Sequence, residues 1–185
     1  DTYMHNKLPN IFYFINTFEE NYIRKLDNKV SIIFRNYHEK YNEKLIINIK
    51  NFCKTQNRKF FLSNNLKLAL KLNLDGVYLP SFNKSLNTKM NNHKKNFTII
   101  GSAHNVREIK IKEQQRAKLI FISPLFTVKK SKKFLNPVKF NLLASKTTQK
   151  VIALGGINHL NFKKLKLINA YGFAGISYFE YNNNL

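Results

Sequence analysis

Two short motifs in the last third of the chain have residue types that suit the binding of a phosphate group. Gly155 and Gly156 follow one apolar run, and Gly175, Ile176 and Ser177 end the next. A glycine has no Cβ, so its backbone N–H group can approach an anion closely, and a serine hydroxyl adds a donor. We predict that these residues form a phosphate-binding site. The alternative, that the glycines only relieve crowding at a bend of the chain, remains open.

A group of lysines follows the apolar run at residues 119–123. Lys129, Lys130, Lys132 and Lys133 flank Ser131. On a loop over a binding site, such a cluster can clamp a diphosphate group. A solvated loop without a ligand explains the same residues equally well.

His104 stands at the end of an apolar run, where a general acid or base could act. No Asp or Glu obviously orients it, so a structural role is favoured. Cys53 is the only cysteine, which excludes an internal disulfide and a cysteine-rich metal site. It lies on the apolar side of an expected helix, and we expect it in the core.

The chain carries 32 Lys and Arg against 10 Asp and Glu, a formal net charge of +22 at pH 7. This balance is typical of proteins that bind nucleic acid or an anionic surface. The basic residues are spread along the whole chain, however, and AT-rich coding sequence alone would produce this abundance of Lys, Asn, Ile and Phe. Dispersed charge indicates a solvated surface, so we do not expect a nucleic-acid partner. A small phosphorylated ligand is attracted in either case.

The elements that must position these residues are short apolar runs without polar alternation, typical of strands buried on both faces. They span residues 11–17, 30–35, 59–63, 76–79, 98–102, 119–123, 151–155 and 173–177. Segments with apolar residues at helical spacing lie between them. The clearer ones span residues 41–52, 66–74, 106–117, 138–146 and 162–169, with weaker ones at 19–27 and 85–94.

Eight strands alternating with helices predict a small (β/α)8 TIM barrel, an α/β fold in which ligands bind at the carboxyl ends of the strands. Few residues follow the last strand, so we expect the eighth helix to be truncated or absent. A doubly wound open sheet is the alternative. The length of 185 residues and the 43% hydrophobic content predict a single domain, residues 1–185.

The sequence offers no run of about 18 apolar residues for a transmembrane helix. Its first ten residues are polar and mixed, unlike a signal peptide. Because the single cysteine also fits a reducing compartment, we expect a cytoplasmic protein without a membrane partner.

Several motifs resemble the thiamine phosphate synthase family, which includes the thiazole tautomerases of the TenI type. They are Ile100-Gly101-Ser102-Ala103-His104, Phe121-Ile122-Ser123-Pro124-Leu125-Phe126 and Val151-Ile152-Ala153-Leu154-Gly155-Gly156-Ile157. The similarity extends to residues 60–70 and 75–81 and covers roughly residues 11–179.

The resemblance implies a synthase that joins a pyrimidine diphosphate to a thiazole phosphate and releases diphosphate. A Mg²⁺ held by two carboxylates neutralises the leaving group in that family. By the same resemblance Arg35 grips the diphosphate, while the family's nearby glutamine and lysine fall on Ile33 and Tyr37 and are lost. Gly156, Ile176 and Ser177 match the thiazole-phosphate site.

Other family positions are altered. The asparagine–aspartate pair falls on Ser63 and Asn64, and a second aspartate falls on Asn83, so both Mg²⁺ carboxylates are missing and we expect no metal site. Ser102 matches a family serine, and Lys130 or Lys132 takes the place of a family lysine. We therefore count Arg35, Ser63, Asn64, Ser102, Lys130 and Lys132 as candidate substrate-binding residues, with no catalytic residue assigned.

The segment Leu79-Pro80-Ser81 is closer to the tautomerase branch, but that branch's histidine falls on Ser123 or Pro124. Three hypotheses follow. The first is a family member of thiamine biosynthesis, a transferase-like protein with altered or lost synthase activity. The second is a non-catalytic protein that binds a phosphorylated ligand, and the third is a basic nucleic-acid-binding protein.

Overall fold

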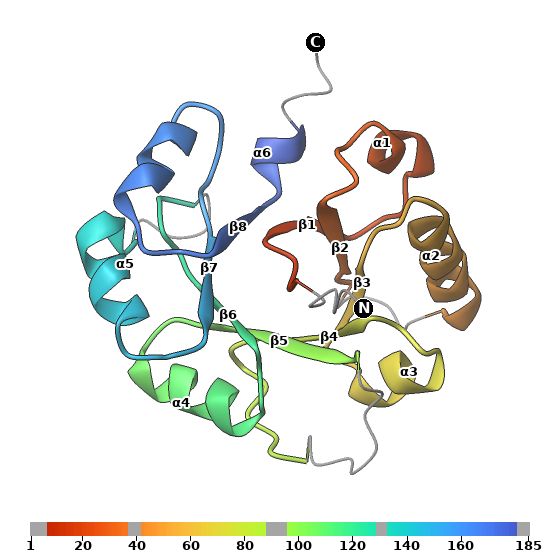
Figure 1. The fold of residues 1–185 in the computed structure, drawn as a ribbon, viewed down its shortest axis with the longest axis horizontal. Coiled ribbons are helices and arrows are strands. Elements are labelled where there is room, and N and C mark those ends of the chain that lie inside the picture. The colour runs from red at the N-terminus through yellow and green to blue at the C-terminus, as the bar shows by residue number, and fades with distance from the viewer. Residues whose placement is uncertain (1–6, 37–41, 88–95, 129–132, 181–185) are drawn as a thin grey trace, which may run out of the picture.

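The computed structural model describes residues 7–36, 42–87, 96–128 and 133–180. Its strands form a closed parallel barrel in chain order, in which β8 pairs with β1 (Figure 1). The strands are β1 (Ile11–Ile15), β2 (Val30–Phe34), β3 (Phe60–Ser63), β4 (Gly76–Leu79), β5 (Thr98–Ala103), β6 (Leu119–Ile122), β7 (Lys150–Leu154) and β8 (Gly172–Gly175). The predicted barrel is confirmed, and the open-sheet alternative is wrong.

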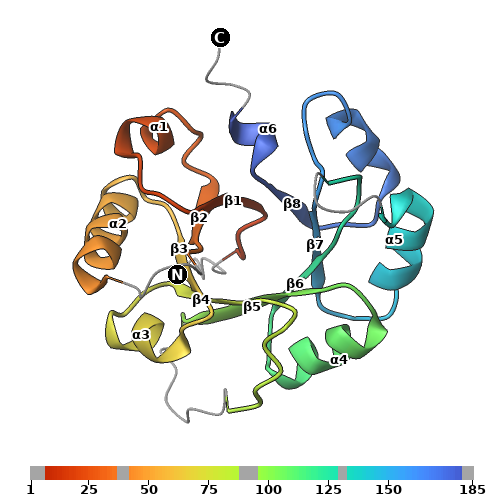
Figure 2. The same cartoon turned by 180° about the vertical axis from the view of Figure 1, so that it is seen from behind.

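Helices ring the outside of this barrel, as Figures 1 and 2 show from opposite sides. They are α1 (Glu20–Arg24), α2 (Glu43–Thr55), α3 (Leu66–Lys71), α4 (Val106–Gln114), α5 (Asn136–Ala144), the 3-10 helix η1 (Phe162–Leu167) and α6 (Ser177–Glu180). Asparagines begin several of them: Asn42, Asn65 and Asn105 each accept a hydrogen bond from a backbone N–H in the first turn.

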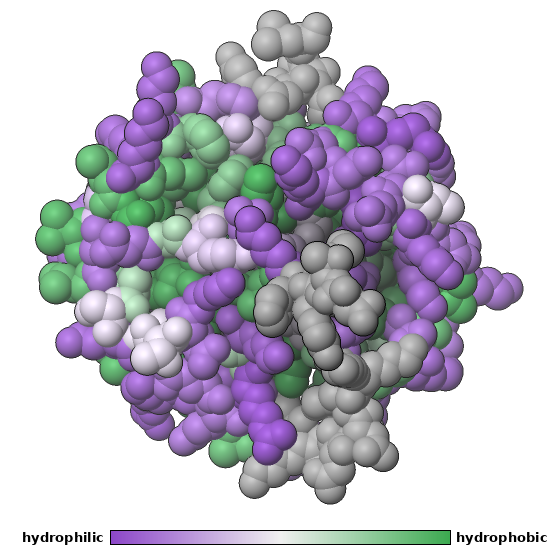
Figure 3. Space-filling view, viewed as in Figure 1, coloured by the Kyte–Doolittle hydropathy of each residue, from purple (hydrophilic) through white to green (hydrophobic). Residues whose placement is uncertain are grey.

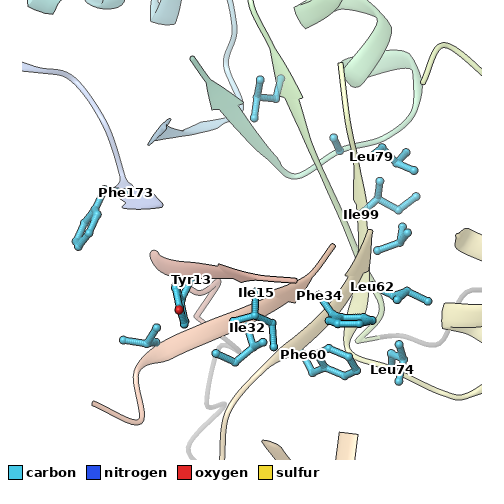
Figure 4. Close-up of a cluster of buried hydrophobic side chains, with 14 of the residues drawn as sticks. Tyr13, Ile15, Ile32, Phe34, Phe60, Leu62, Leu74, Leu79, Ile99 and Phe173 are labelled. Carbon is cyan, nitrogen blue, oxygen red and sulfur yellow. The ribbon is translucent and has the colours of Figure 1, made fainter. Parts of the chain in front are cut away.

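Alternate residues of each strand face two different apolar layers. The barrel interior contains Phe12, Phe14, Phe61, Tyr78 and Phe121, with ring contacts such as Phe14–Tyr78 at 5.1 Å between centroids. The intervening residues face the helices; Figure 4 shows Tyr13, Ile15, Phe34, Phe60 and Leu62 of this outer layer. Burial on both sides explains why the strands lack polar alternation.

Three expectations about the elements need correction. Residues 85–87, the described start of the weakly predicted helix 85–94, are not helical, and residues 88–95 lie outside the described part. The segment expected as an α-helix over 162–169 forms η1. β8 ends at Gly175, so Ile176 lies after the strand and Ser177 begins α6, which has four residues, a truncated eighth helix as expected.

The surface is mostly hydrophilic on the face shown in Figure 3, with green areas over α5 and the segment that follows β7. Exposed apolar side chains there include Val138, Leu142 and Leu167. None of the helices in the described part of the chain has both the length and the apolar character needed to cross a membrane.

Candidate functional site

The carboxyl ends of β2 and β5–β8 surround a cavity of about 1000 Å³. Its lining contains every residue of the predicted phosphate site together with one predicted substrate contact: Arg35, Gly155, Gly156, Gly175, Ile176 and Ser177. The barrel brings the two glycine motifs together because β7 and β8 are neighbours, with Leu154 opposite Ala174. The two glycine motifs therefore lie next to each other at the barrel mouth, and their role in phosphate binding stays a prediction.

Backbone donors are available at this edge. The N–H groups of Gly156 and Ser177 have no hydrogen-bond acceptor among the residues that the structure describes. Both residues line the cavity, and neither lies inside a strand whose ladder would use its N–H group. Free backbone N–H groups that face a common space can bind an anion. We call this region, formed by residues 155–157 and 175–177, the anion cup.

The glycines of the cup are also required by the backbone itself. Gly155 and Gly156 have φ angles of +95° and +70°. A Cβ on Gly156 would lie 2.5 Å from the carbonyl oxygen of Thr127, and one on Gly155 would lie 2.8 Å from Pro124. Any side chain would therefore strain this turn whether or not an anion binds. The interpretation of the glycines as relief of crowding is thus compatible with the structure and does not exclude the anion cup.

The loop after Gly156 is held by asparagine side chains. Asn161 donates from Nδ2 to the Gly156 carbonyl oxygen at 2.7 Å, and its Oδ1 accepts from the Asn158 backbone N–H at 2.9 Å. The Gly156 carbonyl oxygen is therefore satisfied by a donor of its own loop. Asn158, which directly follows the glycine motif, also lines the cavity, as do Thr127 and Phe134, whose sequence context did not indicate it.

Arg35 is the cation that the strand ends supply to the cavity. Its backbone N–H donates to the Ile15 carbonyl oxygen at 2.8 Å, which continues the β1–β2 ladder by one residue. Its guanidinium carbon lies 5.2 Å from the ring centroid of Phe14, inside the barrel. Ile33, where the family resemblance expects a glutamine, is fully buried in the barrel interior.

His104 lies across the cavity and is fixed by its neighbours. Its Nδ1 lies 2.8 Å from the carbonyl oxygen of Ser123 and 3.2 Å from that residue's Oγ. Because a carbonyl only accepts, Nδ1 is the donor in the contact with the Ser123 carbonyl. Glu108 accepts a hydrogen bond from the His104 backbone N–H at 2.7 Å. No sequence pattern indicated the contact with Ser123.

The remaining candidate residues lie elsewhere. Ser63 and Ser102 are buried in β3 and β5 and do not line the cavity. Asn64 lines a separate hollow together with Asn83, Ser85 and Asn87. Lys130 and Lys132 lie outside the described residues, whereas Lys133, from the same lysine group, lines the cavity.

Asn64 and Asn83 occupy the positions where the family resemblance expects the carboxylates of Mg²⁺. Asn83 donates from Nδ2 to Asn64 Oδ1 at 2.7 Å, so the side-chain oxygen of Asn64 is already engaged. Mg²⁺ sites need one or two carboxylates. The described residues contain no cluster of three or more His, Cys, Asp or Glu side chains suited to a metal ion. The residues present at this position do not fit a Mg²⁺ site.

Fold and site together define a (β/α)8 barrel whose mouth cavity is lined by free backbone donors and an arginine. The sequence model of the family described as thiamine monophosphate synthase matches residues 17–179. The chain belongs to this family.

Individual relatives agree with this assignment. A protein from Aquifex aeolicus (strain VF5), provisionally named thiamine-phosphate synthase 2, is 34% identical over 123 residues, 64% of each chain. The thiamine-phosphate synthase of Methanococcus vannielii is 27% identical over 120 residues, 64% of this chain and 58% of that protein. The matched region thus spans less than two thirds of either relative.

Solved structures support the fold. The thiamine phosphate pyrophosphorylase of Pyrococcus furiosus superposes with a TM-score of 0.71 at 17% identity, covering 93% of this chain and 91% of the other. FabK of Thermotoga maritima superposes with a TM-score of 0.70 at 10% identity, covering 92% of this chain and 59% of the other. At these identities both similarities show the fold alone, and a fold by itself does not specify an activity.

Proposed function

We propose that this protein binds a phosphorylated small molecule of thiamine biosynthesis in the barrel mouth, with the phosphate in the anion cup. The observation that carries the proposal is the pair of free N–H groups, those of Gly156 and Ser177, which belong to the cavity that Arg35 also lines. A thiazole phosphate is the expected ligand, because the chain belongs to the thiamine monophosphate synthase family.

The cavity supports a ligand larger than a phosphate ion. Its volume is about 1000 Å³, and its lining extends beyond the residues of the cup to Leu154, Leu135 and Phe134. Apolar walls with a few polar groups at one end suit an aromatic heterocycle whose phosphate is held at that end. Arg35 would then contact a second anionic group, such as a diphosphate.

Two versions of this proposal differ in whether the protein converts its bound ligand to a product. In the first the protein is a transferase that joins the two family substrates. In the second it binds the phosphorylated ligand without reaction, which the amide pair Asn64–Asn83 favours because it replaces the expected carboxylates. Diphosphate release from a pyrimidine diphosphate and a thiazole phosphate, with and without Mg²⁺, separates them. Binding without release would establish the second alternative.

The cup itself is tested by calorimetry with inorganic phosphate and inorganic diphosphate. Ser177 is exposed and begins α6, so a substitution there leaves the barrel intact. Ser177→Asp places a carboxylate in the cup and should reduce phosphate affinity at least tenfold by charge repulsion. The matched variant Ser177→Ala keeps the backbone donor and removes only the hydroxyl, so its affinity should fall less than that of Ser177→Asp. Equal affinity in the Asp variant and the wild type would rule out the cup as the anion site.

Gly156→Val would place a side chain in the space of the anion, but it is a poor test of the cup. The close approach to the Thr127 carbonyl and the positive φ angle mean that valine would disturb the turn itself. Loss of binding in that variant would not distinguish a blocked site from a distorted one.

A further inference from the structure

The loop after β4 is fastened to α4 by a lysine with a fully buried side chain. Lys112 donates from Nζ to the carbonyl oxygens of Pro80 and Asn83, both at 2.8 Å, and to Gln115 Oε1 at 2.9 Å. These contacts use all three protons of the ammonium group. Burying an ammonium group costs several kcal/mol, so it stays buried only where such partners compensate the lost water.

Gln115, also fully buried, extends the same network. Its Nε2 donates to the Asn83 carbonyl at 3.0 Å and to the Ser85 carbonyl at 2.8 Å. Lys112 in the last turn of α4 and Gln115, the residue after α4, thus bind three carbonyl groups of the loop, at Pro80, Asn83 and Ser85. Buried peptide carbonyls need a partner; these two side chains supply it, and the Asn83 backbone N–H is a second donor to the Pro80 carbonyl at 3.0 Å.

β5 leaves room for the lysine. A Cβ on Gly101 would lie 2.8 Å from Lys112 Cδ and 2.7 Å from the Leu79 carbonyl oxygen. The aliphatic part of Lys112 therefore crosses the strand where Gly101 has no side chain. Gly101, Lys112 and Gln115 form one arrangement that holds the loop against the barrel.

The loop in turn brings Asn83 to Asn64. Asn83 donates to Asn64 Oδ1 at 2.7 Å, and its own Oδ1 accepts from the Ser85 backbone N–H at 3.0 Å. Asn64 follows β3 with a φ of +58° and donates its backbone N–H to the Tyr78 carbonyl at 2.8 Å. Both asparagines are therefore fixed by backbone contacts as well as by each other.

We propose that Lys112 is a positioning residue for the barrel mouth. Its buried ammonium group, together with Gln115, holds the loop after β4 in the place where Asn83 contacts Asn64. This part of the mouth is therefore organised without a metal ion. The residues involved are 80–85 and α4. This role does not depend on which anion the mouth binds. An experiment can therefore contradict the role of Lys112 and leave the proposed function valid, or contradict the proposed function and leave the role of Lys112 valid.

Hydrogen exchange of the wild-type chain and two variants tests the fastening directly. Lys112→Met and Gln115→Leu each remove part of the network and should accelerate amide exchange in residues 80–87 at least tenfold. Lys118→Met is the matched control, because Lys118 is exposed and lies at the start of β6, outside this network, and it should leave the segment unchanged. Unchanged exchange in both network variants, or equal acceleration throughout the barrel, would overturn the proposal.

A gain of metal binding tests the positioning. If the loop holds positions 64 and 83 together, the variant Asn64→Asp/Asn83→Asp should bind Mn²⁺ or Mg²⁺ at least tenfold more tightly than the wild type in calorimetry. Adding Lys112→Met should remove most of this gain. Charge alone would have the opposite effect, because removal of a nearby cation strengthens cation binding.

The outcomes are therefore distinct. A decrease in metal affinity on adding Lys112→Met reports lost geometry and supports the proposal. Unchanged or increased affinity, or the absence of any metal binding by the two-aspartate variant, contradicts it. Gln115→Leu in the same background provides a second route to the same result if Lys112→Met fails to fold.

Discussion

The guanidinium carbon of Arg35 lies 5.2 Å from the ring centroid of Phe14, so the only arginine that lines the described mouth cavity rests on an aromatic ring of the barrel interior. The ring face attracts the cation and restricts its movement. A positively charged group that is already oriented loses little freedom when an anion binds. Arg35 thus connects the barrel core, through its contact with Phe14, to the binding cavity.

Arg35→Met should weaken binding of inorganic diphosphate at least tenfold, because it removes a charge-assisted donor and keeps most of the aliphatic volume. Calorimetry at fixed ionic strength measures this. Lys118→Met is the control, since it lowers the net charge equally at the opposite end of the barrel, beside the start of β6. If both variants lose affinity to the same extent, general electrostatic attraction explains the binding and Arg35 has no specific role.

Arg58→Met should destabilise the fold by about 3 kcal/mol, because buried carbonyls would lose their charged donor. Arg58 is 3% exposed and donates to the carbonyl oxygens of Ile23, Leu26, Asp27 and Val30. Urea unfolding measures the change. The exposed Arg107→Met should shift stability by less than about 0.5 kcal/mol. Similar midpoints for the two variants would show that these contacts contribute little.

Lys112 should make stability rise with pH above about 8. Burial lowers the pKa of Lys112 from 10.5 to about 8, while nearby Glu108 opposes the shift. Between these two values the unfolded chain holds a proton that the folded chain has released, so the free energy of unfolding increases with pH. Below pH 8 both states are protonated and this contribution is absent. Urea unfolding of the wild type and Lys112→Met at pH 7 and pH 10 should show a greater increase in the wild type.

Cys53 should not react with a thiol reagent in the folded protein at pH 8. The residue is 1% exposed, and burial raises the pKa of its thiol to about 12, which leaves almost no thiolate. In denaturant the same reagent should modify the cysteine completely. Rapid modification of the native protein would contradict the packing of α2 against the barrel.

Duplex DNA should bind weakly and without sequence preference, because the basic residues are spread along the whole chain and do not form one cluster. Fluorescence anisotropy over a range of salt concentrations measures this. Submicromolar affinity that persists at about 200 mM salt would contradict the interpretation of the charge as a solvated surface and favour a nucleic-acid partner. An RNA duplex provides the same test for the other nucleic acid.

The barrel, and the edge of it that carries the anion cup, could be predicted from the amino-acid sequence. Apolar runs such as Phe12–Phe14 must be buried on both faces, and runs of this type alternating with helical segments close into a parallel barrel. Once the barrel closes, Gly156 and Ser177 are at neighbouring strand ends because β7 and β8 are adjacent. Local pattern and connectivity were sufficient for both conclusions.

Which polar residues are buried, and what they contact, depends instead on the tertiary structure. The helical period places Lys112 three residues after the buried Ile109, but a lysine at that position is normally found at the surface. Its burial depends on carbonyl groups of Pro80 and Asn83, about thirty residues earlier in the chain. The hydrogen bond between Asn64 and Asn83 likewise joins residues 19 positions apart, although neither side chain is buried. A buried charge or amide is stable only when distant segments supply its partners, and sequence spacing does not contain that information.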